Sequence, residues 1–207
     1  ISEYTGAIYA VDVFWAPDMT LKVLQDRGIV APKPPDVVLA GNFPKQMIFS
    51  YGYAPRLLSM VIQYNTKLVP AGRVPKGYED LADPMWKGKL VLIDITTHLT
   101  GAVFFMTLRD MWGQEKFWSW VRGLLANEPI WQKDWIATAK AIELGDGAVT
   151  QGNPTDIVVG QNRGSPIDVV WPNPTLASPT PVTIASKPPH PNAGKLFIQF
   201  MVTDALK

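Results

Sequence analysis

The stretch 78–94 constrains the fold of this chain more than any other segment. Its first residues have room for little more than one helical turn, because the residue before Pro84 avoids the α region and ends the helix. The apolar run 90–93 follows, and it has the length and composition of a buried strand in an α/β sheet. Trp86 lies between the two and is expected to be a buried hydrophobic anchor. The stretch therefore predicts a short helix, a tight turn and a buried strand in one rigid unit.

Strands and helices alternate along the chain, which favours an α/β fold with helices on both faces of a mostly parallel sheet. Short apolar runs predict strands, and apolar stripes bounded by glycine or proline predict helices. The proline-rich passage 31–35 is expected to run extended over the surface. The predicted strands are 10–15, 57–64, 90–93, 148–150, 166–171 and 181–185, and the predicted helices are 19–27, 100–111, 115–125, 135–144 and one that begins at 191.

Charge and cysteine content exclude several kinds of site. The net charge of +1 comes from 19 basic and 18 acidic residues that are interspersed, so we expect no nucleic-acid partner and no polybasic membrane patch. The absence of cysteine excludes disulfides, thiolate metal sites and cysteine nucleophiles, and it agrees with an extracytoplasmic location. Only His98 and His190 are histidines, which argues against a histidine-built zinc site. We expect neither a metal nor a cofactor.

An enzyme is a competing class. The chain has no Gly-x-Ser-x-Gly elbow and no phosphate-binding glycine loop of the Walker or dinucleotide type. Neither histidine has an evident catalytic partner, and nothing indicates that Asp94, Asp134 and Asp156 converge into a carboxylate pair. We therefore expect no catalytic residue, and a hydrolase is the less favoured alternative.

Five short segments, in the expected order, resemble bacterial extracellular solute-binding proteins of family 1, the type II periplasmic binding proteins that feed ABC importers. The resemblance is to the iron(III), thiamine and phosphonate-like branch. The segments are Asp12-Val13, Tyr64–Lys67, Trp86–Lys89, Pro166–Asp168 and Pro189–Phe197.

The resemblance implies a type II fold, with two α/β lobes of mixed, mostly parallel sheet joined by crossing hinge strands, and a solute held in the cleft between them. On that template the first lobe takes residues 1–66 plus 180–207, and the second takes 67–179. Both ends look truncated, and an N-terminal βαβ segment of the first lobe is expected to be missing.

The resemblance also implies the function: a non-catalytic, monomeric component of an ABC importer that captures a small-molecule solute and delivers it to a membrane permease. Its expected location is the periplasm, or the outside of the cell with a membrane anchor. A small organic anion, with a carboxylate or a phosphate-like group, is the expected solute. A ferric-iron-binding transport protein and a ligand-sensing extracytoplasmic module remain alternatives.

The first candidate site is the loop between the strand 90–93 and the helix that follows it. Backbone N–H groups at a helix N-terminus, with hydroxyl side chains nearby, suit a carboxylate or a phosphate. Thr100 is equally interpretable as a helix N-cap, and His98 as a solvated loop histidine. The candidate ligand-binding residues here are Thr97, His98, Thr100 and Gly101.

The second candidate site is the loop 150–156, where Gln151, Asn153 and Thr155 are the candidate ligand-binding residues. In the iron-binding members of the family, this region resembles a pair of adjacent tyrosines that coordinate the metal. No tyrosine follows Tyr78 here, and ferric iron needs anionic oxygen ligands. The neutral side chains favour an organic ligand held by hydrogen bonds, with a simple turn as the alternative.

The remaining candidates are aromatic or basic residues near predicted strand ends. Trp15 follows a strand and could stack on a planar ligand or cap the core. Tyr53 and Arg56 precede the crossing strand 57–64, and Arg56 could clamp a carboxylate or simply be exposed. Trp171 could add an aromatic wall.

Overall fold

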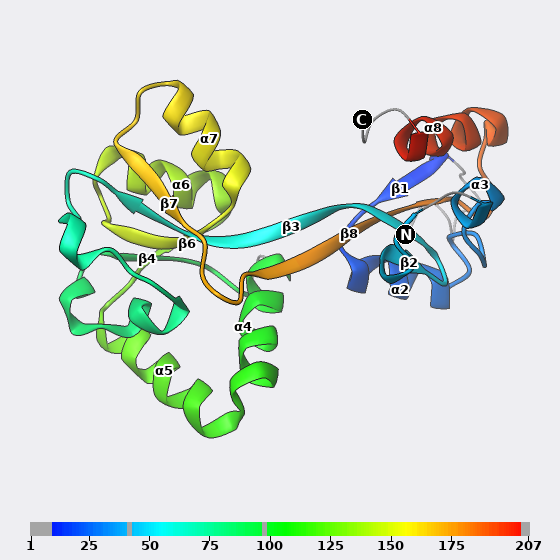
Figure 1. Cartoon of the computed structure of the whole chain (residues 1–207). Coiled ribbons are helices and arrows are strands. Elements are labelled where there is room, and N and C mark those ends of the chain that lie inside the picture. The colour runs from blue at the N-terminus through cyan, green and yellow to red at the C-terminus, as the bar shows by residue number, and fades with distance from the viewer. Residues whose placement is uncertain (1–9, 41–42, 97–98, 204–207) are drawn as a thin grey trace. The chain divides into compact units, whose positions relative to one another are not determined.

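The computed structural model describes residues 10–40, 43–96 and 99–203. The chain forms two compact units, of which unit 1 comprises 1–58 and 178–207, and unit 2 comprises 59–177. Two strands run from one unit into the other, β3 (Gly52–Asn65) and β8 (Leu176–Ile184), as Figure 1 shows. The unit boundaries therefore lie inside these strands.

Unit 1 has antiparallel strand pairs covered by helices. β1 (Val13–Trp15) pairs with β8, and β2 (Ile48–Phe49) pairs with the first part of β3. The helices are α2 (Asp18–Asp26), α3 (Asp36–Ala40) and α8 (Pro191–Thr203), with a 3₁₀ turn η1 (Lys45–Met47). The sequence predicted α2 and α8 but not the short α3.

The core of unit 1 consists of two groups of buried apolar side chains. The first includes Leu21 and Leu24 of α2, and the second joins the strands β3 and β8 to α8 through Tyr53, Val182 and Ile198. The apolar stripe that predicted α2 is therefore the side of the helix that packs in the core.

Unit 2 is built on a mixed sheet. β4 (Leu90–Ile93) pairs in parallel with β5 (Ile130–Gln132) and β6 (Val149–Gly152). β3 runs antiparallel to both β6 and β7 (Ile167–Val170). The mixed α/β fold is confirmed, but parallel pairing among the described strands is confined to β4, β5 and β6, because the long strand β3 runs against its neighbours.

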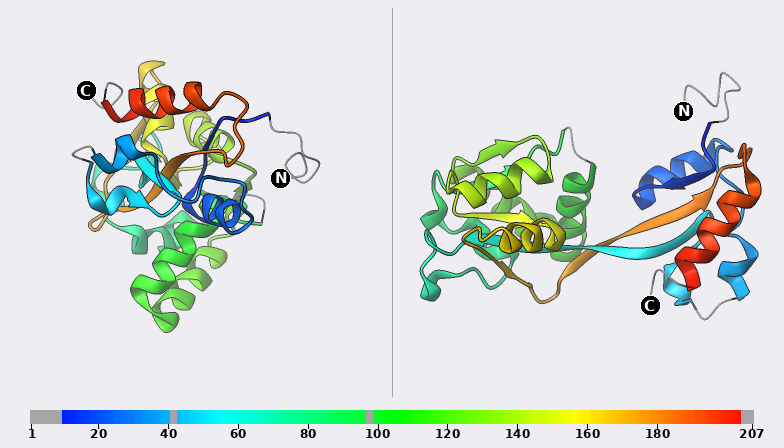
Figure 2. Two further views of the ribbon diagram at one scale, coloured as in Figure 1. Left: turned by 90° about the vertical axis from the view of Figure 1, so that its right-hand side faces the viewer. Right: turned by 90° about the horizontal axis from the view of Figure 1, so that it is seen from above.

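Helices cover both faces of this sheet, as Figures 1 and 2 show. Ile62 and Leu90 pack with α4 (Leu99–Trp112) and α5 (Gln114–Ala126) on one face. Their neighbours in sequence, Val61 and Val91, pack with α6 (Trp135–Leu144) and α7 (Pro154–Asn162) on the other. Alternate side chains of a strand point to opposite faces, so burial on both sides explains why β4 is apolar throughout.

The segment 78–94 has the predicted structure. It forms the 3₁₀ turns η3 (Tyr78–Ala82) and η4 (Pro84–Trp86) and then β4, after a separate turn η2 (Ala71–Arg73). Trp86 is 2% exposed, and its indole N–H donates to the carbonyl of Asp80 at 2.7 Å. The prediction of a buried tryptophan anchor is confirmed.

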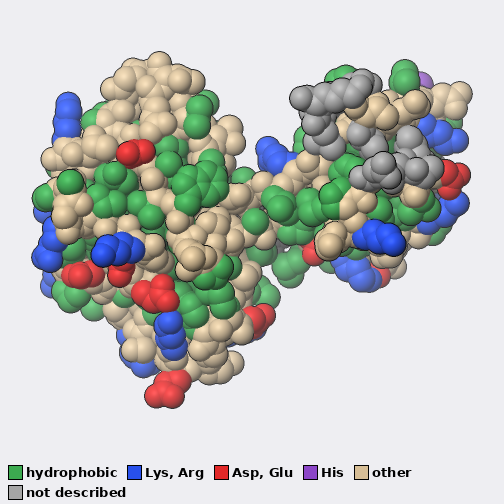
Figure 3. Space-filling model, viewed as in Figure 1, with side chains coloured by type: hydrophobic (Ala, Val, Ile, Leu, Met, Phe, Trp, Pro, Cys, Tyr) green, Lys and Arg blue, Asp and Glu red, His purple; other side chains and the backbone are tan. Residues whose placement is uncertain are grey.

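In the part of the chain that the structure describes, no helix combines the length and the apolar character needed to cross a bilayer. Basic and acidic side chains lie intermixed on the face of unit 2 seen in Figure 3.

Candidate functional site

The carboxyl ends of three parallel strands meet at one edge of unit 2, which we call the strand-end surface. Ile93 of β4 lies opposite Gln132 of β5, and the backbone N–H of Asp94 donates to the carbonyl of Gln132 at 2.7 Å. Helices α4, α6 and α7 begin shortly after β4, β5 and β6. Such an edge combines strand ends with helix N-termini and is where open α/β sheets bind ligands.

The N-terminus of α6 is already occupied by a carboxylate. Asp134 precedes the helix, and its Oδ1 accepts the backbone N–H of Ala137 at 2.8 Å. This acidic side chain uses the positive end of the helix, so a second anion there would meet like charge.

The N-terminus of α7 is occupied in a similar way. Asn153 is its N-cap: Oδ1 accepts the N–H of Thr155 at 2.9 Å, and Nδ2 donates to Asp156 at 3.1 Å. Burial raises the pKa of the Asp156 carboxyl, and the nearby charge of Glu143 raises it further. Both atoms of the Asn153 amide serve helix capping, whereas Thr155 is exposed.

The first turn of α4 carries no acidic residue. It packs tightly against β4, since a Cβ added at buried Gly101 would lie 2.6 Å from Cγ2 of Ile93. Asp94, just before it, accepts hydrogen bonds from the N–H and hydroxyl of Thr96 at 2.9 and 2.7 Å, which lower the pKa of its carboxyl. Among the three helix starts, α4 therefore offers the first turn most suited to an anion.

Three of the candidate ligand-binding residues between β4 and α4 have side chains outside the described part of the structure. Thr97 and His98 lie outside the described residues, and the Thr100 side chain does as well, although its backbone belongs to α4. Their predicted contacts with a ligand stay predictions.

Gln151 is a buried hydrogen-bond donor at the end of β6. It is 3% exposed, and Nε2 has no hydrogen-bond partner among the described residues. Its cross-strand partner is Ile62, which packs against Phe104 and Leu108 of α4. Directly opposed residues share a face of the sheet, so the Gln151 side chain lies on the face that α4 covers. A buried donor left without an acceptor costs about 1–3 kcal/mol.

Gln63 lies beside Gln151 in the sheet but faces the opposite way. It is paired with Thr150, and its Nε2 donates to the carbonyl of Ala139 of α6 at 3.5 Å. Its Oε1 is also buried without a partner in the described part of the chain. The two glutamines are therefore neighbours in the sheet of unit 2 whose side chains lie on its opposite faces.

In unit 1 the structure brings together two residues that the sequence proposed separately. The guanidinium of Arg56 lies 5.8 Å from the centre of the Trp15 ring, within the range of a cation–π contact. The indole N–H of Trp15 donates to the carbonyl of Thr180 at 3.0 Å. Both side chains are exposed, so they form a polar and aromatic surface next to the end of β1.

Tyr53 has a different environment. It lies within β3 rather than before the crossing strand, and its ring is completely buried against Phe43 with 4.9 Å between ring centres. The hydroxyl donates to the carbonyl of Ile198 at 3.4 Å, and burial raises the pKa of the phenol. These contacts give Tyr53 a packing role in unit 1.

Two other residues complete the comparison with the sequence. Trp171 follows β7 in unit 2 and is exposed.

Asp18 begins α2 and is not among the candidates from the sequence. Burial raises the pKa of its carboxyl, and Oδ1 has no hydrogen-bond partner among the described residues. Its position directly after a strand and at the start of a helix was the signal available in the sequence.

Comparison with known families gives one match over most of the chain. Residues 43–207 match the model of a family described as bacterial extracellular solute-binding protein. A curated relative, iron uptake protein A1 of Synechocystis, is 25% identical over 224 residues, which cover 96% of this chain and 59% of the relative. The chain spans less than two thirds of the length of the curated relatives it matches.

Solved structures share the fold. Iron-bound HitA from Pseudomonas aeruginosa superposes with a TM-score of 0.81 at 21% identity, covering 99% of this chain and 69% of that chain. AfuA from Actinobacillus pleuropneumoniae, solved with fructose-6-phosphate, gives 0.76 at 20% identity, covering 95% and 64%. Trichodesmium IdiA (FutA), solved with iron and citrate, gives 0.79 at 20% identity, covering 99% and 69%. The predicted type II periplasmic-binding-protein fold is confirmed.

Proposed function

Because this chain belongs to the bacterial extracellular solute-binding protein family, we propose that it is the substrate-binding component of an ABC importer and captures a small organic anion outside the cytoplasm. Its partners are then the solute and a membrane permease, and its role is non-catalytic. The anion carries a carboxylate or a phosphate-like group. The two compact units would be the two lobes of such a protein.

The observation that carries the choice of ligand is the unpartnered Nε2 of Gln151. This atom is a donor, so its natural partner is an oxygen acceptor of the ligand rather than a cation. It lies on the face covered by α4, whose first turn carries no acidic residue. A ligand oxygen that accepts from Gln151 would replace a buried unsatisfied donor with a hydrogen bond.

Ferric iron is the second candidate, because two of the solved neighbours contain it. Fe(III) prefers anionic oxygen ligands such as phenolates. Unit 2 has only Tyr64 and Tyr78. Tyr78 is buried and donates to the carbonyl of Met60, and Tyr64 donates to Asp168 at 3.4 Å. Burial raises the pKa of both phenols, which opposes phenolate formation and supports the organic anion over bare iron.

A ligand panel tests the proposal. Isothermal calorimetry would compare citrate, a sugar phosphate, inorganic phosphate, ferric citrate and a ferric salt with a weak chelator. We expect an organic anion to bind without iron. Binding that strictly requires iron would favour the ferric alternative, and co-purification of an uncharged solute in native mass spectrometry would contradict the anion.

Substitutions of Gln151 test the residue itself. We expect Gln151→Leu to weaken affinity by about tenfold, from one lost hydrogen bond of about 1.5 kcal/mol, while the unliganded protein becomes no less stable. Gln151→Glu should weaken affinity further, because it adds a negative charge. Gln63→Leu is the matched control on the opposite face and should leave affinity unchanged. Equal losses for the two Leu variants would show that Gln151 acts only through the fold.

A further inference from the structure

The proline-rich passage 31–35 borders a hollow of unit 1 that the proposed function does not use. The passage lies beside the end of β8, where the backbone N–H of Ala31 donates to the carbonyl of Ile184 at 2.9 Å. Residues 31–36 and side chains of the segment 184–199 line a hollow of about 550 Å³, which we call the proline hollow. Its volume falls within the range of about 300–1,000 Å³ that sites for small molecules have.

The lining of the proline hollow is mostly apolar and rigid. Ile184 and Ala185 belong to it and are 9% and 2% exposed. Proline has no backbone N–H and its ring fixes φ, so prolines present apolar surface in one backbone conformation. A ligand therefore binds without first ordering the chain around it. The prolines that line the hollow are Pro32, Pro34, Pro35, Pro188 and Pro191.

The charged side chains of the lining leave one positive charge unbalanced. Lys33 and Asp36 form an ion pair at 2.9 Å. Lys195 of α8 is exposed and makes no ion pair with a described residue. The proline hollow therefore complements a ligand with one negative charge.

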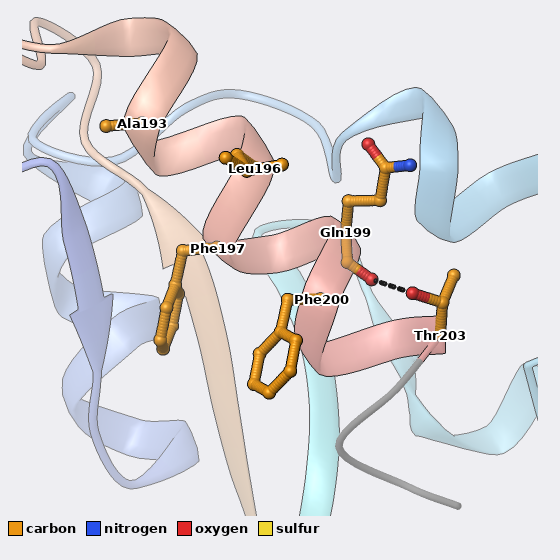
Figure 4. Close-up of a pocket in the computed structure, with 6 residues that line it drawn as sticks. All are labelled: Ala193, Leu196, Phe197, Gln199, Phe200 and Thr203. Carbon is orange, nitrogen blue, oxygen red and sulfur yellow. Dashed lines mark hydrogen bonds between the residues drawn. The ribbon is translucent and has the colours of Figure 1, made fainter.

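Gln199 adds a neutral hydrogen-bonding group to the same hollow. It lies four residues after Lys195 in α8, so the two side chains are neighbours on the helix surface. Figure 4 shows the Gln199 amide pointing away from the rings of Phe197 and Phe200. An ammonium and an amide N–H beside apolar surface are donors suited to a carboxylate.

We propose that the proline hollow is a second ligand site of this protein and binds a small, flat, apolar carboxylate. The apolar body of the ligand lies against the prolines, and its carboxylate accepts hydrogen bonds from Lys195 and Gln199. This site belongs to unit 1, whereas the strand-end surface belongs to unit 2.

Calorimetric titration of the 207-residue chain tests the proposal with cinnamate, and the uncharged cinnamamide is the matched probe. Lys195→Gln removes the cation of the hollow, and Lys195→Arg keeps it. Lys45→Gln is the control for net charge, because Lys45 is also exposed in unit 1 but does not line the hollow.

We expect cinnamate to bind with a Kd below about 1 mM, as suits a ligand of its size. Cinnamamide, and cinnamate with Lys195→Gln, should bind at least about threefold more weakly, because each loses an exposed ion pair. Lys195→Arg and Lys45→Gln should bind as the parent protein does. Unchanged affinity of Lys195→Gln, or an equal loss for Lys45→Gln, would overturn the assignment of an anion to the hollow.

Methyl NMR spectra locate the bound probe, because an aromatic ring shifts the resonances of nearby methyl groups. We expect cinnamate to shift Ile184 and Ala185, which line the hollow, and to leave Ile157 of unit 2 unchanged. The Gln151→Leu protein should bind cinnamate as the parent does, because Gln151 lies in unit 2. Shifts confined to unit 2, or no saturable binding, would overturn the second site.

Discussion

Trp86 is the residue for which sequence and structure agree most closely. Its ring is buried in the core group that includes Tyr78 and Leu81, and its N–H is bonded to Asp80. We expect Trp86→Ala to lower the free energy of unfolding by about 3–5 kcal/mol, because it leaves a large cavity. Denaturant unfolding followed by circular dichroism would measure the loss.

Trp118→Ala is the control, because Trp118 is exposed and its N–H donates to Gln114 of the same helix. Its loss should stay below about 1 kcal/mol. Ligand affinity of the folded Trp86→Ala protein should be unchanged. Normal melting with lost binding would instead make Trp86 part of the ligand site.

Asp156 gives a pH dependence with a definite sign. Its carboxyl pKa is raised above the ordinary 3.8 in the folded state, so the folded protein holds this proton more tightly than the unfolded chain. The contribution of Asp156 to stability is therefore largest below pH 3.8 and declines as the pH rises through the folded pKa. We expect Asp156→Asn, which can still accept from Asn153, to be more stable than the parent protein at pH 7. The gain should vanish below pH 3.8.

Thermal melting at several pH values would measure this difference. Asp146→Asn, at an exposed carboxylate of the same unit, controls for the change in net charge. It should alter stability by no more than about 0.5 kcal/mol at pH 7. A lower stability of Asp156→Asn at pH 7 would mean that the charged carboxylate stabilises the first turn of α7.

At the scale of elements, the first turn of α4 depends on a glycine. Gly101→Ala would place a methyl group 2.6 Å from Cγ2 of Ile93. We expect a loss of about 1–3 kcal/mol from overpacking, although alanine is the better helix former. Gly194→Ala in α8 is the control, because its nearest contacts are at 3.5 Å, and it should gain about 0.4–1 kcal/mol. Differential scanning calorimetry of both variants would measure the two changes in stability. A more stable Gly101→Ala protein would contradict the overpacking and show that α4 can shift away from β4.

Helix α5 shows how an apolar stripe can be assigned wrongly. In the predicted helix 115–125 we interpret Phe117, Trp118, Val121, Leu124 and Leu125 as the inward apolar stripe. The buried residues are instead Phe117, Trp120 and Leu124. Trp118 and Leu125 are exposed, whereas the N–H of Trp120 reaches the carbonyl of Tyr78. The helix has apolar residues on most sides, so only its neighbour could select the buried side.

At the scale of the whole molecule, ligand binding should protect unit 2 first. If the anion bonds to Gln151 beside α4, hydrogen exchange should slow in the peptides of β6 and the first turn of α4, since a ligand adds its binding free energy to the cost of opening. Peptide-resolved exchange with and without whichever anion of the calorimetric panel binds would measure this effect. Protection confined to unit 1, around Trp15 and Arg56, would contradict the assignment of the strand-end surface.

Much of the fold follows from local sequence signals. The strand Leu90–Ile93 and the helix Trp135–Leu144 have the predicted bounds, because composition, capping and the stop at Gly145 define them within a few residues. Helix α7 was missed, although Asn153 as N-cap and Pro154 in the first turn are ordinary start signals. The apolar pattern of α7 is too weak to predict a helix, so the sequence indicates a loop over 150–156 instead.

The candidate site depended on long-range pairing. The sequence alone selected Gln151 and Asn153 as neighbours in one loop, but pairing with β3 makes Gln151 a buried strand residue, while Asn153 caps a helix. Likewise, Trp15 of β1 lies near Arg56 of β3 only because β8 pairs with β1 on one side and with β3 on the other. The sequence by itself determined the alternation of strands and helices, the buried Trp86 and the family, because each of these depends on residues that are close together in the chain. Tertiary structure decided which polar groups lack partners, because strand register and helix packing join residues far apart in the chain.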